Sequence, residues 1–249
     1  MMLRLLFSRR WLLTTFLVVL GAAVCVRLGI WQLDRLEQRR TFNAHVLEMR
    51  SLPPLDLNRV TDPGILVNME YRAAIARGKY DYAAQIALRN QYHEGQYGYH
   101  LLTPLVLDEN LVILVDRGWI PAEGNATPND WRKYDETETE VTVRGILRLG
   151  APQRDAPSDV TRLDFWKMVD LDRIAAQMPY PIVKVYLQLD PQEGRTQPPI
   201  PYQPTLDLSE GPHFGYAIQW FTFAAILLFG YPFYVRKQEQ PPLGSNHRQ

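Results

Sequence analysis

The sequence predicts a membrane α+β protein. Two transmembrane helices flank an antiparallel, β-rich extracytoplasmic domain, folded as a barrel or a sandwich, with one short helix. Three observations support this fold class. Residues 214–234 contain no charged side chain, and a helix of that length would be about 30 Å long, which matches the hydrocarbon core of a bilayer. Residues 11–30 form a second apolar run, and the stretch between the two runs contains several alternating segments.

Composition excludes some classes of function. The 249 residues carry 27 basic and 27 acidic side chains, whereas a nucleic-acid-binding protein usually shows a basic excess. Cys25 is the only cysteine, which rules out an intramolecular disulfide and a copper or zinc site built on paired cysteines. The length suits two membrane spans and one domain of ordinary size.

The second apolar run has the features of a transmembrane helix over residues 213–235. Aromatic side chains gather at both of its ends, where amphipathic rings prefer the membrane interface. Arg236 and Lys237 follow the run, and His213 stands at its opening.

The first apolar run, residues 11–30, is open to more than one interpretation. A cleaved signal peptide or a lipoprotein signal ending at Cys25 would also begin with a basic segment. The run is long for a signal core, however, and Val24 is branched where lipoprotein processing requires a small residue. We therefore predict an uncleaved helix. Gly21, Cys25 and Gly29 recur every four residues, which is either a stripe for close helix packing or chance spacing.

Flanking charges predict the topology. Three arginines, Arg4, Arg9 and Arg10, precede the first span, and Arg236, Lys237 and Arg248 follow the second. The positive-inside rule then makes residues 1–10 and 236–249 cytoplasmic and residues 31–212 periplasmic. The early start of the first helix leaves no room for a transit peptide, which favours a bacterial inner membrane. The arginines after the first span, Arg35, Arg39 and Arg40, do not oppose this, because long domains translocate largely regardless of charge.

The central domain is expected to consist of short strands. The first helix should continue out of the membrane to about Arg40, and residues 99–107 and 111–120 should pair as a hairpin. Residues 171–178 predict a short helix that ends at Pro179, and the proline-rich residues 197–204 predict an extended spacer that forms neither a ladder nor a helix. Further strands are expected at residues 71–80, 85–90, 140–149, 165–169 and 182–189.

Motifs in this domain do not indicate an enzyme. The sequence has no phosphate-binding glycine loop, nucleophile elbow or helical pair of metal-spaced histidines. His93 and His100 could form a metal site, but a hydrogen-bonding pair is the simpler interpretation. Residues 116–119, Asp-Arg-Gly-Trp, could bind a ligand. We favour a structural corner in which Arg117 pairs with a carboxylate and Trp119 fills the core.

The opening of the second span is the candidate binding site. Because the two helices run in opposite directions, their outer ends meet at a similar depth. A neutral imidazole at His213 is a good ligand for haem iron. Nearby arginines could pair with haem carboxylates, and tryptophans could line a flat apolar slot. The alternative is an interfacial anchor whose side chains meet lipid headgroups. The candidate residues are His213, Tyr216, Gln219 and Trp220 on the second helix and Arg27, Trp31, Gln32 and Arg35 on the first.

Three motifs in this order resemble the surfeit-locus-one family of cytochrome c oxidase assembly factors. They are Leu-Gly-Ile-Trp-Gln at residues 28–32 with Arg35, Thr-Pro-Leu at 103–105 followed by Val-Asp-Arg-Gly-Trp-Ile-Pro at 115–121, and His-Phe-Gly-Tyr-Ala-Ile-Gln-Trp at 213–220. Family members commonly have asparagine where this chain has Asp116, and leucine where it has Phe214. Neither difference affects the histidine.

The resemblance implies a non-enzymatic respiratory-chain chaperone in the cell inner membrane. Its expected role is to bind haem a transiently, with His213 as the iron ligand, and to assist its insertion into the oxidase. Expected partners are the catalytic subunit of cytochrome c oxidase, haem a synthase and the lipid bilayer, and no nucleic acid. The first alternative is a scaffold that stabilises an assembly intermediate without binding haem. A sensor and a membrane-anchored enzyme are weaker alternatives, because the cytoplasmic tails are short and catalytic motifs are absent.

Overall fold

The computed structural model describes residues 5–109, 111–154 and 162–239. Arg4 and Arg248 of the topology prediction therefore lie outside the described residues, as does the tail after residue 239. The chain divides into two compact units. One joins the first helix to the C-terminal helix, over residues 1–44 and 207–249, and the other comprises residues 45–206.

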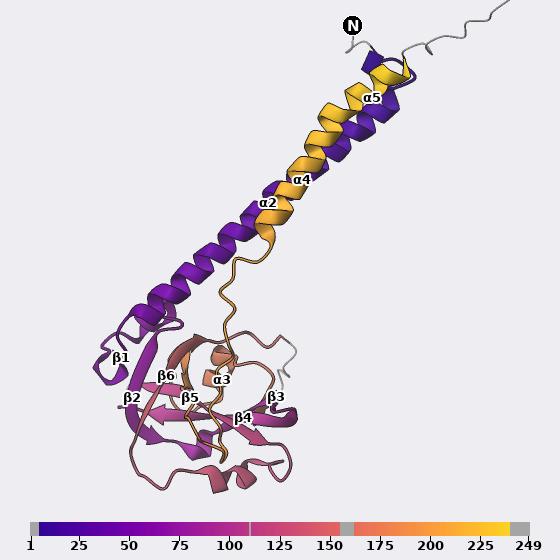
Figure 1. The fold of residues 1–249 in the computed structure, drawn as a ribbon. Helices are drawn as coiled ribbons and strands as arrows, with labels where there is room; N and C mark the ends of the chain where they lie inside the picture. Colours follow the sequence, from indigo (N-terminus) through magenta and orange to yellow (C-terminus); the bar gives the residue numbers. More distant parts are fainter. Residues whose placement is uncertain (1–4, 110, 155–161, 240–249) are drawn as a thin grey trace, which may run out of the picture. The chain divides into compact units, whose positions relative to one another are not determined.

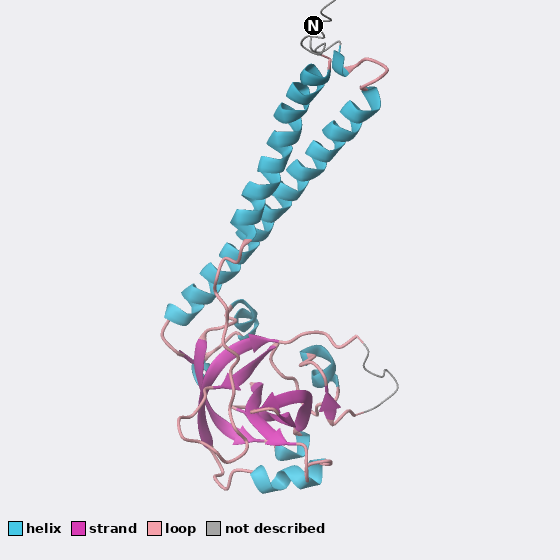
Figure 2. Cartoon of the chain, turned by 45° about the vertical axis from the view of Figure 1, so that its right-hand side comes forward, coloured by secondary structure: helices cyan, strands magenta, loops and turns pink. Residues whose placement is uncertain are grey.

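The helical unit contains two helices that are long and apolar enough to cross a membrane, judged by length and composition. Helix α2, Leu12–Ser51, extends beyond the predicted end near Arg40 and stops just before two prolines, which cannot continue a helix. The second span consists of α4, His213–Ala225, one π-helical turn, η5, Ile226–Gly230, and α5, Tyr231–Gln238. Figures 1 and 2 show α2 and α4 lying side by side.

The other unit is built on one eight-stranded sheet in the order β1-β2-β6-β8-β5-β4-β3-β7. Strand β2 also pairs with β4, so that β2, β6, β8, β5 and β4 close into a barrel. The strands are β1 Leu55–Asp56, β2 Ala73–Tyr80, β3 Ile86–His93, β4 Gln96–Val106, β5 Val112–Pro121, β6 Val141–Leu149, β7 Phe165–Trp166 and β8 Val185–Leu189. Four 3-10 helices, η1 Leu57–Arg59, η2 Pro63–Asn68, η3 Tyr82–Ala84 and η4 Pro128–Tyr134, and the short helix α3, Leu171–Ala176, connect them.

The expectation of an antiparallel sheet was wrong, because the sheet is mixed. Three pairs of strands, β1–β2, β3–β7 and β5–β8, are parallel. The pairing of β5 with β8 arises because the chain crosses over through β6, β7 and α3 before β8, and such a crossover delivers a strand in the same direction. The predicted β4–β5 hairpin is confirmed by an antiparallel register from Gly98↔Pro121 to Val106↔Val112.

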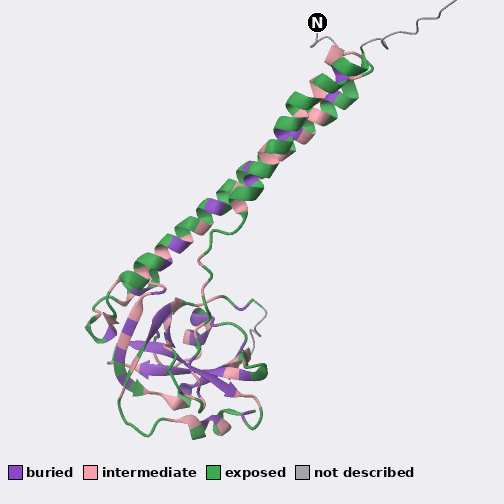
Figure 3. Ribbon diagram, viewed as in Figure 1, coloured by how far each residue is buried: buried purple, intermediate pink, exposed green. Residues whose placement is uncertain are grey.

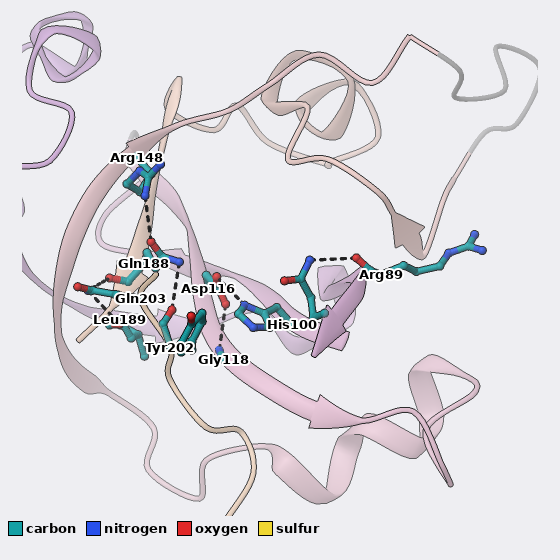
Figure 4. Close-up of polar contacts among 10 residues, drawn as sticks. Arg89, His100, Asp116, Gly118, Arg148, Gln188, Leu189, Tyr202 and Gln203 are labelled. Atoms are coloured by element: carbon teal, nitrogen blue, oxygen red, sulfur yellow. Dashed lines mark hydrogen bonds and ion pairs between the residues drawn. The ribbon is translucent and has the colours of Figure 1, made fainter. Parts of the chain in front are cut away.

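The return segment after β8 forms neither a ladder nor a helix, as predicted, but it makes a single bridge to the barrel. The backbone N–H groups of Trp119 and Ile200 each donate to the other residue's carbonyl, at 2.8 and 2.9 Å. The Gln203 side-chain amide donates to the carbonyls of Gln188 and Leu189, and the Gln188 amide donates to the carbonyl of Tyr202 (Figure 4). Proline therefore excludes a long ladder here but not a single bridge.

The barrel interior holds the main hydrophobic core, which appears as the buried strands in Figure 3. Alternating side chains of β2, β5 and β8, among them Ala74, Ile113 and Leu187, are almost fully buried in it. A second cluster lies beneath α3, where Ile174 and Trp166 are buried. The pattern of short apolar strands therefore gives one closed core with a satellite under the short helix.

Residues 116–119 form the structural corner that the sequence favoured. The β4–β5 register shifts at Arg117, which is therefore the extra residue of a β-bulge. Its guanidinium is buried, donates to Gln85 at 3.1 Å and to the Tyr134 carbonyl, and lies 3.3 Å from the Glu136 carboxylate. It also lies over the Tyr80 ring at 5.1 Å. The Arg117 guanidinium therefore finds its hydrogen-bond and ion-pair partners within the folded domain itself.

The neighbouring Asp116 binds His100, so the expected hydrogen-bonding pair of His93 and His100 was wrong. The His100 Nδ1 atom lies 3.0 Å from Asp116 Oδ2, and both side chains are buried (Figure 4). His93 instead lies against the Trp119 ring, at 5.3 Å between centroids. Across the described residues, no group of three or more histidine, cysteine and acidic side chains is placed to hold a metal ion.

Substitution of Gly118 should strongly destabilise the barrel. Its φ is +113°, and a Cβ atom there would lie 2.2 Å from the Ile200 carbonyl oxygen. We expect Gly118→Ala to lower the free energy of unfolding by about 2–5 kcal/mol, from backbone strain and overpacking together. Thermal unfolding of the full-length protein in detergent would measure this loss.

Gly95→Ala is the matched control, because Gly95 also has a positive φ, +81°, but has no atom within 4 Å of an added Cβ. It should cost only about 1–2 kcal/mol, from the left-handed conformation alone. Equal losses in the two variants would show that the return segment does not press on Gly118.

The buried His100–Asp116 pair should make stability depend on pH. Burial by itself lowers the pKa of His100, but the charge and hydrogen bond of Asp116 outweigh it and raise the pKa above its ordinary value. The pair's contribution is therefore fully present below about pH 6.5, the ordinary histidine pKa, and is lost as the pH rises through the raised folded-state value. We expect His100→Gln, which cannot titrate, to flatten the decline of Tm above that pH. A variant whose Tm declined as steeply as the wild type would contradict this assignment.

Candidate functional site

The site lies along the seam between the two long helices of the helical unit. Five residues of α2, each seven positions after the last, are buried. A seven-residue repeat of buried positions is the pattern of a left-handed helix pair. These residues are Thr15, Ala22, Gly29, Leu36 and Asn43. On the second helix, Ala217 and Ala224 are buried at the same spacing.

Small residues let the two backbones approach closely at the seam. A Cβ atom on Gly29 would lie 2.7 Å from the Phe221 ring, and one on Gly21 would lie 3.6 Å from the Leu227 side chain. Cys25, between them, is half-buried. The stripe predicted from Gly21, Cys25 and Gly29 therefore faces the second helix, which is the arrangement typical of small residues in membrane helix pairs.

Polar contacts fix the pairing at the N-terminal end of α2. The Thr15 hydroxyl lies 2.9 Å from the Tyr231 hydroxyl. The Trp11 indole N–H donates to the Glu239 carboxylate at 2.9 Å, and Arg10 forms an ion pair with the same carboxylate at 3.2 Å. Since residues near the start of α2 contact residues near the end of α5, the two helices are antiparallel, as the sequence predicted.

A second set of contacts, here named the clamp, holds the segment before α4 against α2. The clamp consists of Arg39, Arg40 and Asn43 on α2 and residues 207–210. Arg40 binds Glu210 through two hydrogen bonds of 2.8 and 3.0 Å, and the bond from Arg40 lowers the pKa of Glu210. Arg39 donates to the Ser209 carbonyl, and Asn43 to the Leu208 carbonyl at 2.6 Å. The clamp therefore fixes where α4 begins relative to α2.

His213 is the first residue of α4 and contacts Gln32 directly. The His213 Nδ1 atom lies 2.8 Å from Gln32 Oε1. A carboxamide oxygen can only accept a hydrogen bond, so Nδ1 carries a proton, and in the neutral ring Nε2 keeps its lone pair. Gly211, with φ +68°, lies beside this edge of the ring, where an added Cβ would be 3.7 Å from Nε2. Among the described residues, Nε2 has no hydrogen-bond partner.

The two flanks of the seam at this level differ in character. Phe221 over Gly29 covers one flank. On the other, helical periodicity places Gln32 and Arg35 of α2 on the same side as Tyr216 and Trp220 of α4, whereas Trp31 lies about 200° around α2 from Gly29, on the face away from the seam. Tyr216 is 46% exposed, so this flank presents accessible aromatic surface near His213, and Trp31 is 41% exposed on its own face of α2.

The predicted site residues are only partly brought together. His213 contacts Gln32, and the Arg35 guanidinium lies 5.5 Å from the centre of the Trp31 ring. Trp220 packs at 6.0 Å against Phe223. The three others, Arg27, Tyr216 and Gln219, are exposed, and their side chains have no hydrogen bond or ion pair within the described part of the chain. Their roles in binding stay predictions.

Sequence reasoning missed the residues that set this geometry. Phe221, Asn43, Gly211 and Glu210 were not singled out, although they cover one flank or fix the start of α4. The seven-residue spacing of Thr15, Ala22, Gly29, Leu36 and Asn43 is a signal that could have located the seam. The clamp has no comparable signal, because its residues are distant in sequence.

Comparisons with known proteins show that the chain is similar to members of one family. A family model described as the SURF1 family matches residues 19–225. A SURF1-like protein of Rickettsia bellii is 25% identical over 242 residues, which cover 94% of this chain and 96% of the relative. An uncharacterized SURF1-like protein of Mycobacterium bovis is 26% identical and covers 97% of this chain. Surfeit locus protein 1 of Takifugu rubripes is 26% identical over 172 residues, or 62% of this chain and 70% of that protein.

Gly29 should be essential to the close approach of the helices. We expect Gly29→Leu to lower the Tm of the detergent-solubilised protein, because the Phe221 ring occupies the space that the new side chain needs. The double variant Gly29→Leu/Phe221→Ala should recover part of the loss, since it vacates that space. Gly215→Leu, at a helical glycine with nothing within 4 Å of an added Cβ, is the control and should change little. A Gly29→Leu variant as stable as the wild type would disprove the packed seam.

Proposed function

The chain belongs to the SURF1 family, and from that premise we propose that it is an integral membrane assembly factor for haem–copper cytochrome c oxidase. Family membership supports a role in oxidase assembly. The proposal goes further: the protein binds haem a through His213 and assists its insertion into the catalytic subunit. It acts in the cell inner membrane, with both termini cytoplasmic and the barrel domain periplasmic.

The haem proposal rests on the hydrogen bonding of the two ring nitrogens of His213. Its Nδ1 atom is engaged by Gln32, whereas Nε2 has no partner among the described residues. A neutral imidazole with an available Nε2 is a common axial ligand of haem iron. The residues present therefore fit a haem, which would supply the iron for His213 to bind.

The surrounding side chains suit an amphiphilic macrocycle. Tyr216 and the half-buried Trp220 offer flat apolar surface near His213, and the exposed Trp31 and Gln219 are further proposed contacts at this level of the two helices. Arg27 is exposed and has no ion pair in the described chain, so it can meet a propionate, as can Arg35 beside Trp31. A single histidine ligand suits the transfer of haem a, because this protein must bind haem a more weakly than the final oxidase site does.

Partner docking is assigned to the barrel domain. Its proposed partners are the oxidase catalytic subunit and haem a synthase. Within the family premise a second role remains, a scaffold that stabilises an oxidase intermediate without binding haem. The paired helices and the barrel suit that role equally, and only the His213 geometry favours the carrier.

The decisive experiment is the absorption spectrum of the full-length protein purified in mild detergent from cells that make haem a. We expect the wild type to carry haem a, and His213→Ala to lose it or to show a shifted spectrum, because the proposed iron ligand is removed. Haem content would be quantified as the pyridine haemochrome against protein concentration.

His45→Ala is the matched control, since it removes another half-buried histidine, one that lies on α2, and should leave the spectrum unchanged. A colourless wild type from cells shown to contain haem a would reject the carrier and leave the scaffold. A coloured His213→Ala protein with an unaltered spectrum would retain the carrier and reject His213 as its ligand.

A further inference from the structure

We propose that Gln32 is the positioning residue of this site. It holds the His213 ring in the tautomer with the proton on Nδ1, and thereby presents the Nε2 lone pair to an iron porphyrin. This inference rests on the proposed function for its ligand. The state of the ring that it assigns to the haem-free protein can be tested independently.

The hydrogen bond fixes the proton because its two ends are chemically unequal. In free histidine the neutral ring carries its proton on either nitrogen, and only the unprotonated nitrogen can bind a metal. Gln32 Oε1, at 2.8 Å from Nδ1, accepts but cannot donate. The contact therefore excludes the tautomer in which Nε2 is protonated and unable to bind iron.

The surrounding packing holds Gln32 in place. It lies on the seam face of α2 between two buried residues, Gly29 three positions before it and Leu36 four positions after it. The Phe221 ring contacts Gly29 on one side of this level, and the clamp anchors residues 207–210 on the other. Gln32 and His213 thus belong to helices whose register is fixed both above and below their contact.

The neutral amide of Gln32 also influences the strength of the proposed bond between His213 and the haem iron. A hydrogen bond from Nδ1 to an acceptor increases the basicity of the metal-binding nitrogen, and a carboxylate does so more strongly than an amide. An amide therefore orients the ring while adding little to the iron–nitrogen bond. This combination suits a protein that must release its haem, because orientation is kept while the ligand stays labile.

The first test requires no haem. Two-bond ¹H–¹⁵N correlation spectra of the ¹⁵N-histidine-labelled full chain in detergent, at about pH 8.5 where histidine is ordinarily neutral, report which ring nitrogen carries the proton. His213→Ala identifies the signals of His213. We expect a protonated Nδ1 in the wild type and a mixture of tautomers in Gln32→Leu. A wild-type ring protonated on Nε2, the result of an amide that donates to Nδ1, would overturn the proposal.

The second test uses haem a added to the purified protein. Removing a partner that orients a metal ligand typically lowers metal affinity about 10- to 100-fold, and we expect Gln32→Leu to weaken haem a binding within that range. Gln32→Glu retains an acceptor and should bind at least as tightly as the wild type. It should also shift the haem reduction potential to a more negative value and slow haem transfer to apomyoglobin. A structural role alone would not reverse direction between the two variants.

Gln238→Leu, at an exposed glutamine near the end of α5, is the matched control and should leave affinity and potential unchanged. Wild-type affinity and potential in both Gln32 variants would overturn the positioning role. If the wild type binds no haem a, the carrier function fails instead, and if His213→Ala binds haem a as well as the wild type, His213 is rejected as the ligand. In either case the labelled-histidine spectra still decide what Gln32 does to the ring.

Discussion

The helical unit depends on the close approach of two backbones at Gly29, where the Phe221 ring occupies the space of a missing side chain. Membrane helices gain little from burying apolar side chains, since lipid is equally apolar, so contact must come from fitted shapes and polar bonds. The seven-residue repeat of buried positions on α2 supplies the fit. Thr15 with Tyr231 and the clamp at Asn43 supply polar bonds at its two ends.

Between those ends, the helix pairing brings His213, at the start of the second helix, to hydrogen-bond distance from Gln32. The arrangement is asymmetric. One edge of the imidazole is engaged by the protein, and one flank of the seam is covered by an aromatic ring. The other edge has no hydrogen-bond partner among the described residues, although Gly211 lies beside it, and the other flank carries the exposed Tyr216. The proposed carrier role would use this asymmetry, because a ligand that is held from one side can enter and leave from the other. The neutral hydrogen-bond partner and the single nitrogen proposed to bind iron would serve the same end.

The barrel explains several conspicuous side chains without assigning them to a site. Arg117 is the bulged residue of β5 and is held by Gln85, Tyr134 and Glu136. Asp116 pairs with His100 inside the fold. These polar groups satisfy one another, which is what burial requires of them. Trp119, next to them, is buried while the return segment bridges its backbone. A motif that combines charge, glycine and tryptophan can thus be conspicuous for reasons of folding.

The sequence by itself determined the two apolar helices, the short strands between them and the family, because hydrophobic periodicity and short motifs are local properties of the chain. It also identified His213 and the small-residue stripe. Only the tertiary structure decided that β5 and β8 are parallel, that Ile200 bridges to Trp119, and that α2 continues to Ser51. The contact between His213 and Gln32 belongs to this second group. Strand direction and pairing across 181 positions of sequence depend on which surfaces meet, and no local pattern records that.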